Sequence, residues 1–131
     1  MKFHKDGTSP KNGEVFVFGS NKAGVHGAGA ALHAAKNFGA LRGVGYGMVD
    51  KSFAIPTKDN NIQTMHLDEI KGYVDLFINF ANKRQHLNFY ITRIGCGLAG
   101  YTDSDIAPMF KGIGDNCSVV YEWKNLLEGK Q

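Results

Sequence analysis

The stretch that decides the fold is EVFVFGSNKAGVHGAGAALHAAKN, residues 14–37. It opens with a continuous run of β-branched and aromatic residues at 15–18, which is typical of a strand buried on both faces. Glycines at 24, 27 and 29 allow tight turns or a close approach of the backbone to another group. The alanine-rich segment from Ala28 favours a helix, and Gly39 suits its C-terminal cap. We therefore expect a strand, a glycine-rich loop and a helix.

A glycine-rich loop that leads into a helix offers free backbone N–H groups and the positive end of the helix dipole. Both favour an anionic ligand, most often a phosphate. The P-loop pattern GxxxxGK[ST] does not occur in the chain, and Gly27-Ala28-Gly29-Ala30-Ala31 is followed by Leu32 instead of the last glycine of the dinucleotide pattern. The alternative, that these glycines only let the strand and helix pack closely, stays open.

Length and composition indicate one globular domain over residues 1–131. We expect an irregular N-terminal segment at 1–13 with a brief edge strand at Lys2–His4, and a tail at 124–131 that forms a short terminal helix. Hydrophobic residues make up 43% and charged residues 21%, and the net charge of +3 favours anionic partners only mildly. No apolar run is long enough to cross a membrane, and the N-terminus lacks the apolar core of a secretory signal. Cys96 and Cys117 are expected to be reduced thiols, which favours a cytoplasmic protein. We expect no metal and no cofactor.

The remaining elements follow from apolar periodicity and turn residues. Residues 41–48 contain three glycines and are expected to form a flexible loop or an irregular connection to the next strand. We expect strands at 51–57, 87–94 and 117–121, with Pro56 ending the first of them, a helix at 66–85, and a helix from Thr102, which pairs with Asp105 as a capping box. Strands that alternate with helices predict an α/β fold: a three-layer α/β/α arrangement with a mostly parallel central sheet.

Two further features lie where strands of this sheet are expected to end. Gly95-Cys96-Gly97-Leu98-Ala99-Gly100-Tyr101 forms a second glycine-rich loop, and Lys58 follows the strand at 51–57. Ligands of open α/β sheets bind at the carboxyl ends of the strands, so two neighbouring glycine loops there could hold a diphosphate between them. Cys96 has glycines on both sides and no obvious base beside it, which favours a small buried loop residue over a nucleophile.

With both loops in view, the chain resembles the macro domains, the family of ADP-ribose-binding domains. The resemblance is carried by FGSN, GVHGAGAALHAAKNFG, AIPTKD and ITRIGCGLAGY, in this order, and spans residues 14–121. It implies that Ser20 and Asn21 belong to the ligand site, with Asn21 facing the distal ribose. It also implies that residues 27–30 form the first turn on the diphosphate side of the ligand, and that residues 95–101 close over the diphosphate and the distal ribose. These residues are Gly27, Ala28, Gly29, Ala30, Gly95, Cys96, Gly97, Leu98, Ala99, Gly100 and Tyr101. Asp6 matches the acidic residue that holds the adenine amine.

Within this family the motifs are most similar to the lysine-dependent terminal ADP-ribose protein glycohydrolase type. In that type a lysine attacks the distal ribose C1″ and releases a glutamate side chain, and an aspartate resolves the adduct. Lys58 matches the lysine, and a partly desolvated amine can act as a nucleophile. The position of the aspartate holds Ala99, so Asp59 or Asp103 would have to replace it.

The resemblance implies binding of ADP-ribose or a related nucleotide diphosphate, together with hydrolysis of ADP-ribosyl ester linkages. The alternative is a non-catalytic module that recognises or sequesters an ADP-ribose-derived nucleotide, for instance in a phage or bacterial setting, and Ala99 favours it. The expected partner is ADP-ribose or an ADP-ribosylated substrate, and no membrane. Nucleic acid is not favoured, because no basic stripe with interleaved aromatic residues is visible.

Overall fold

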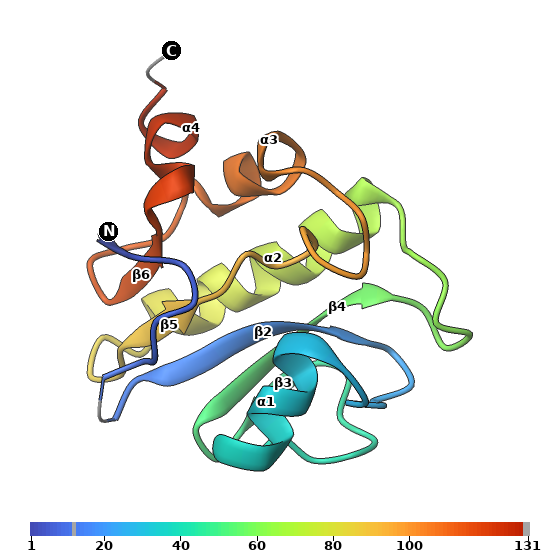
Figure 1. Cartoon of the computed structure of the whole chain (residues 1–131). Helices are drawn as coiled ribbons and strands as arrows, with labels where there is room; N and C mark the ends of the chain where they lie inside the picture. The colour runs from blue at the N-terminus through green and yellow to red at the C-terminus, as the bar shows by residue number, and fades with distance from the viewer. Residues whose placement is uncertain (12, 130–131) are drawn as a thin grey trace.

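The computed structural model of the chain describes residues 1–11 and 13–129, and these form a central sheet with helices on both faces (Figure 1). Within this described part, six strands lie in the order β1-β6-β5-β2-β4-β3. Their bounds are β1 Lys2–His4, β2 Val15–Asn21, β3 Gly47–Val49, β4 Ser52–Lys58, β5 Phe89–Ile91 and β6 Cys117–Val120. Neighbouring strands pair parallel, except that β3 pairs antiparallel with β4. The predicted α/β class with a mostly parallel sheet is thus confirmed.

The helices form two unequal layers, and Figure 1 shows α1 alone on one face of the sheet with α2, α3 and α4 on the other. The helical bounds are α1 Gly29–Asn37, α2 Leu67–Asn82, α3 Asp103–Ile106 and α4 Lys124–Glu128, with 3₁₀ turns η1 Ala107–Phe110 and η2 Tyr121–Trp123. Because side chains alternate along a strand, Val15 and Val17 of β2 pack under α2, whereas Phe16 and Phe18 pack under α1. This alternation explains why the run at 15–18 is apolar throughout.

Each main helix carries its apolar residues on the face that meets the sheet. Ile70, Val74, Phe77 and Ala81 of α2 recur every three or four residues and are buried. The shorter α1 buries only Ala31 and Ala34, whose small side chains allow a close approach to β2. Gly39, with φ +79°, follows the C-cap of α1 as expected.

The structure corrects several predicted boundaries. Pro56 does not end its strand, because β4 continues to Lys58. Its missing N–H is tolerated because β3 pairs no further along β4 than Ala54, and the β2–β4 register shifts between Ser20 and Asn21 just beside it. The predicted loop at 41–48 contains the start of β3. The helix from Thr102 does form the predicted capping box, but it continues as a 3₁₀ turn that accommodates Pro108.

Of three other segments, one is shorter than predicted and two form as predicted. The predicted strand at 87–94 pairs only over β5, since the chain turns away at residues 92–94 to enter the second glycine loop. The predicted edge strand at Lys2–His4 forms as β1 and pairs with β6. The tail forms the predicted short helix, α4, whose Leu127 is buried, and the last two residues lie outside the described part. No helix in the described residues has the length and apolar character needed to span a membrane.

Candidate functional site

Three adjacent strands end together at one edge of the sheet and build a cleft there. The strands are β5, β2 and β4, with β2 in the middle. The first glycine loop (residues 22–28) follows β2, the second glycine loop (residues 95–101) follows β5 after a short connection, and Lys58 ends β4. The cleft has a volume of about 830 Å³ and is lined by parts of all three segments. Parallel pairing therefore brings together features that are up to 80 positions apart in the chain.

The first glycine loop is closed by the side chain of Asn21. Its amide nitrogen donates a hydrogen bond of 2.8 Å to the Val25 carbonyl, and its oxygen accepts one of 3.0 Å from the Val25 N–H. Asn21 is only 9% exposed, but it still lines the cleft. In this structure the Asn21 side-chain amide thus shapes the loop. A ribose hydroxyl could hydrogen-bond to this amide only beside the Val25 backbone groups or in their place.

The glycine-rich segment at 41–47 is an irregular connection into β3, one of the two predicted alternatives, and its backbone contacts the first glycine loop. We call this segment the brace. The Gly43 N–H donates to the Gly24 carbonyl at 2.9 Å, and the hydroxyl of the buried Ser20 donates to the Gly45 carbonyl. A Cβ atom on Gly24 would lie only 2.6 Å from Gly43 N, and one on Gly45 would lie 2.9 Å from Lys22 Cα. The two backbones therefore touch, which only glycine permits at these positions.

The second glycine loop is anchored to the segment that joins β4 and α2. The Tyr101 hydroxyl donates to the Met65 carbonyl at 2.6 Å, and the Thr64 hydroxyl donates to the Ala99 carbonyl at 3.1 Å. Its tip approaches the start of α1, because a Cβ on Gly29 would lie 3.7 Å from Leu98 Cδ1. The two loops thus border the same cleft at the start of α1.

The start of α1 is open toward the cleft. Its N-cap residue is Ala28, which has no side chain able to bond the first N–H groups, and the first turn carries no acidic residue. Gly29, Ala30 and Ala31 all line the cleft. The first N–H groups of a helix have no partner within the helix, so this end of α1 has donors and a positive dipole to offer an anion.

Lys58 begins a small hairpin whose turn uses the carboxylate of Asp59. Lys58 and Thr64 form an isolated antiparallel bridge, and Asp59 Oδ1 accepts hydrogen bonds from the N–H groups of Asn61 at 2.8 Å and Gln63 at 3.0 Å. Lys58 lines the cleft, whereas Asp59 does not. Among the described residues no side chain is hydrogen-bonded to the Lys58 amine. Asp59 is thus occupied in holding the turn.

At the opposite end, the N-terminal segment closes the cleft through an ionic network. Arg93 donates to Asp103 from Nε at 3.0 Å and from Nη2 at 2.6 Å, and its Nη1 lies 3.3 Å from Asp6 Oδ2. Trp123 Nε1 donates to the same Asp103 at 2.7 Å. The guanidinium beside Asp103 holds the pKa of that carboxyl below its usual range. Asp103 is therefore an ionised structural anchor for Arg93.

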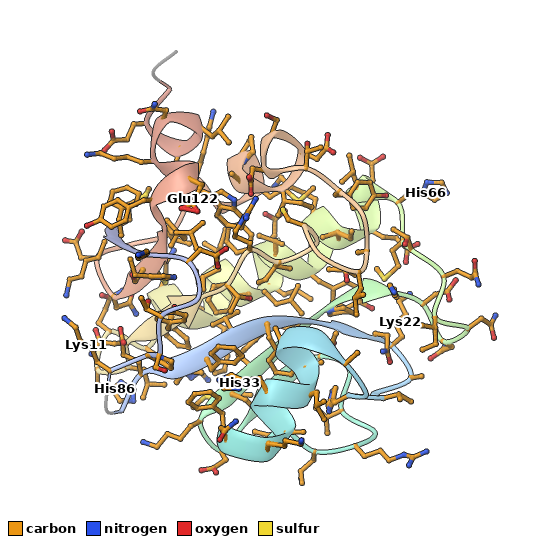
Figure 2. The ribbon with its side chains drawn as sticks, viewed as in Figure 1. Lys11, Lys22, His33, His66, His86 and Glu122 are labelled. Atoms are coloured by element: carbon orange, nitrogen blue, oxygen red, sulfur yellow. The ribbon has the colours of Figure 1, made fainter. Side chains whose placement is uncertain are left out.

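Aromatic side chains form the wall next to this network. The ring of His4 stacks on Tyr90 with centroids 3.8 Å apart, and the Tyr90 hydroxyl donates to the Thr8 carbonyl. Phe16 and His33 continue the wall, and Figure 2 shows His33 on α1. Burial lowers the pKa of His4, so its ring favours the neutral form. A planar, uncharged group fits this end of the cleft better than a charged one.

The thiol of Cys96, in the second glycine loop, is held in its protonated form, which disfavours it as a nucleophile. Burial raises the pKa of Cys96 to about 12, with the negative charge of Asp103 adding to the effect. Its sulfur lies 3.6 Å from the Ile94 carbonyl oxygen. This agrees with the expectation of a small loop residue. No group of three or more His, Cys, Asp or Glu side chains in the described residues is arranged to hold a metal ion.

The structure brings most of the predicted site residues to one cleft and leaves four outside it. The lining includes Asp6, Ser20, Asn21, Gly27, Ala28, Gly29, Ala30, Lys58, Gly95, Cys96, Gly97, Leu98 and Ala99. Gly100, Tyr101, Asp59 and Asp103 do not line it: Tyr101 anchors the second glycine loop, Asp59 holds the hairpin turn, and Asp103 is bound to Arg93.

Sequence reasoning missed several lining residues, among them Val25, Ile62, Tyr90 and Arg93. The sequence did offer a signal for Arg93, because this charged residue lies in the short connection between a strand and a glycine loop. Ile62 had none, because an isoleucine in a polar loop indicates no particular role.

Comparisons with solved structures identify the architecture. The "Macrodomain of Mycobacterium tuberculosis DarG" superimposes with a TM-score of 0.64 at 17% sequence identity, covering 92% of this chain and 97% of that one. The chain has the macrodomain fold. A protein of unknown function from Bacteroides thetaiotaomicron also superimposes, with a TM-score of 0.60 at 19% identity and with 92% and 96% of the two chains covered. No protein-family model matches the sequence, and no curated protein matches it.

Proposed function

We propose that this chain binds ADP-ribose, or a closely related nucleotide diphosphate, in the cleft at the ends of β5, β2 and β4. The observation that carries the proposal is the pair of glycine loops that border the same cleft at the open start of α1 in a chain with the macrodomain fold. Backbone N–H groups and the helix dipole supply what a diphosphate needs, and the loops leave room for it to approach.

The two ends of the cleft differ in a way that suits the two ends of ADP-ribose. The aromatic wall near Tyr90 suits a planar base, and Asp6 retains an oxygen that could accept a hydrogen bond from an exocyclic amine while its other oxygen contacts Arg93. Lys58 and Asn21 lie toward the other end, where polar groups suit the hydroxyls of a terminal ribose. An ADP-ribose molecule with its base beside Tyr90 and its terminal ribose beside Lys58 would have its diphosphate between the two glycine loops.

Binding is tested most sharply by the substitution Ala28→Asp, with Ala35→Asp as a matched control. Aspartate is a better N-cap residue than alanine, so Ala28→Asp should stabilise α1 while its carboxylate repels the diphosphate. Ala35 is exposed on the same helix and does not line the cleft. We expect calorimetry to show ADP-ribose binding to the unaltered chain and to Ala35→Asp, and an affinity at least about ten-fold weaker for Ala28→Asp. Absence of binding to the unaltered chain would refute the proposal.

Hydrolysis of an ADP-ribosyl ester is a second candidate function, carried by the position of Lys58. In such a reaction the unprotonated Lys58 amine would attack C1″ of the terminal ribose, so that an N–C1″ bond forms as the C1″–O bond breaks and the glutamate leaves as a carboxylate. Opening of the ribose ring in this adduct would give an imine, which water must hydrolyse to free the lysine and release ADP-ribose. A general base would then be needed to resolve the imine. Ala99 cannot serve, Asp59 holds the hairpin turn, and Asp103 is bound to Arg93 and Trp123. These contacts favour binding without turnover.

The two functions are separated by incubating the protein with a peptide that carries ADP-ribose on a glutamate. Release of ADP-ribose that is lost in Lys58→Ala would support hydrolysis. Binding of the same peptide without release would support the module that recognises or sequesters its ligand. Release that is unchanged in Lys58→Ala would exclude the proposed role of this lysine.

A further inference from the structure

Ile62, in the turn of the hairpin that Lys58 begins, adopts a left-handed backbone conformation with φ +61°. This conformation is unfavourable for a β-branched residue, because its Cβ crowds the following carbonyl oxygen. The two preceding residues are Asn60 and Asn61, whose residue type tolerates it far better. Among the described non-glycine residues, only Asp50 in the β3–β4 turn shares a positive φ. The strain therefore falls on a residue poorly suited to it.

The hydrogen bonds of the turn hold Ile62 in this conformation. Its N–H donates to the Asp59 carbonyl at 3.1 Å, and the Asp59 N–H donates to the Gln63 carbonyl at 2.8 Å. The carboxylate of Asp59 fixes the residues on either side, Asn61 and Gln63, through their N–H groups. A strained residue that its surroundings fix so completely is a candidate for a functional role.

The side chain of Ile62 is 42% exposed and lines the cleft beside Lys58. Leu98, which is 71% exposed, and Val25, which is 42% exposed, line the same cleft from the two glycine loops. Half of the six exposed large apolar side chains in the described chain thus gather here; the others are Leu41, Leu76 and Tyr121. The hydrogen bond from Thr64 to Ala99 ties the segment that follows Ile62 to the loop that carries Leu98. We call the side chains of Ile62, Leu98 and Val25 the apolar rim.

We propose that Ile62 is a specificity-determining residue that, with the rest of the apolar rim, covers the terminal ribose of the ligand at the Lys58 end of the cleft. The inference rests on the proposed function, because the base and diphosphate occupy the other parts of the cleft. Exposed apolar surface gains free energy when a ligand covers it. The rim thereby favours a ligand that extends past the diphosphate over one that ends there.

The test compares ADP-ribose with ADP, which lacks the terminal ribose, in the unaltered chain and in Ile62→Asn. Asparagine accepts the left-handed conformation and removes the apolar contact. We expect ADP-ribose to bind about five-fold more weakly to Ile62→Asn, as loss of half of an isoleucine contact implies, while ADP affinity stays unchanged. The midpoint of urea unfolding should stay the same or rise, because strain is relieved. Leu76→Asn, on the exposed face of α2, is the matched control and should bind both ligands normally.

A purely structural role for Ile62 would give a different pattern, in which Ile62→Asn unfolds at lower urea and loses ADP and ADP-ribose affinity together. That result would overturn the inference, and so would unchanged ADP-ribose affinity in Ile62→Asn while both ligands bind the unaltered chain. In either case the proposed function would stand. If the unaltered chain bound neither ligand, the proposed function would fail and this inference with it.

Discussion

The contact between the brace at 41–47 and the first glycine loop leads to a prediction for Gly45→Ala. The φ of Gly45 lies outside the left-handed region, so alanine meets no backbone penalty there. The added Cβ, however, would overlap the Asn21 carbonyl oxygen and lie 2.9 Å from Lys22 Cα. Both of these atoms belong to backbone, which cannot rotate away. The substitution therefore isolates the steric effect of the contact.

The size of the effect follows from what must move. Overpacking of this kind costs about 1–3 kcal/mol. Separating the two backbones also strains or breaks the hydrogen bond from the Ser20 hydroxyl to the Gly45 carbonyl, which contributes about 1 kcal/mol. The two contributions overlap, so we expect the free energy of unfolding of Gly45→Ala to fall by about 2–3 kcal/mol. Asn21 lines the cleft, and its displacement should also weaken ADP-ribose binding.

Urea unfolding measures the first effect and calorimetry with ADP-ribose the second. Gly97→Ala is the control for stability, because Gly97 lies in the other glycine loop with no atom within 4 Å of its added Cβ. Gly72→Ala is the control for binding: it lies on α2, has equally open surroundings and should stabilise the helix by about 1 kcal/mol. The reasoning would be refuted if Gly45→Ala changed the free energy of unfolding by less than about 0.5 kcal/mol, the range of ordinary surface substitutions.

Two further predictions concern side chains around the cleft. Asp103→Asn removes the charge that pairs with Arg93 and weakens the acceptor of Trp123 Nε1, so the free energy of unfolding should fall by about 1–3 kcal/mol in urea titrations; an unchanged midpoint would show that the network contributes little. His26 packs edge-on against Phe18 with both ring nitrogens buried and without hydrogen-bond partners, and burial lowers its pKa, so the unfolded chain binds more protons and stability falls as the pH drops below about 6.5. Thermal unfolding between pH 5 and 8 should show a smaller acid-side loss in His26→Phe, and an identical pH profile would contradict this.

The sequence by itself determined the class of the fold and indicated the strand ends at which the candidate cleft lies. Local geometry gives side chains a period of two residues in a strand and of three to four in a helix such as α2. The pattern of apolar residues therefore predicts the alternation of strands and helices. The two glycine loops and Lys58 could be placed at strand ends, and parallel strands share one edge for their carboxyl ends. Nothing beyond the local chain was needed for this.

Only the tertiary structure decided which of these residues remain available to a ligand. Asp59 lies next to Lys58 in the chain, yet its carboxylate holds the hairpin turn; Asp103 follows the second glycine loop, yet it is bound to Arg93 and Trp123. The segment at 41–47 is a brace because its backbone touches a loop about 20 positions away. The left-handed conformation of Ile62 is held by the hydrogen bonds of the turn that Asp59 closes. The contacts of Asp59 and Ile62 are local, because they lie within residues 59–63. The contacts of Asp103 and of the segment at 41–47 instead join residues that meet only when the chain folds, so residue types in order do not encode them locally.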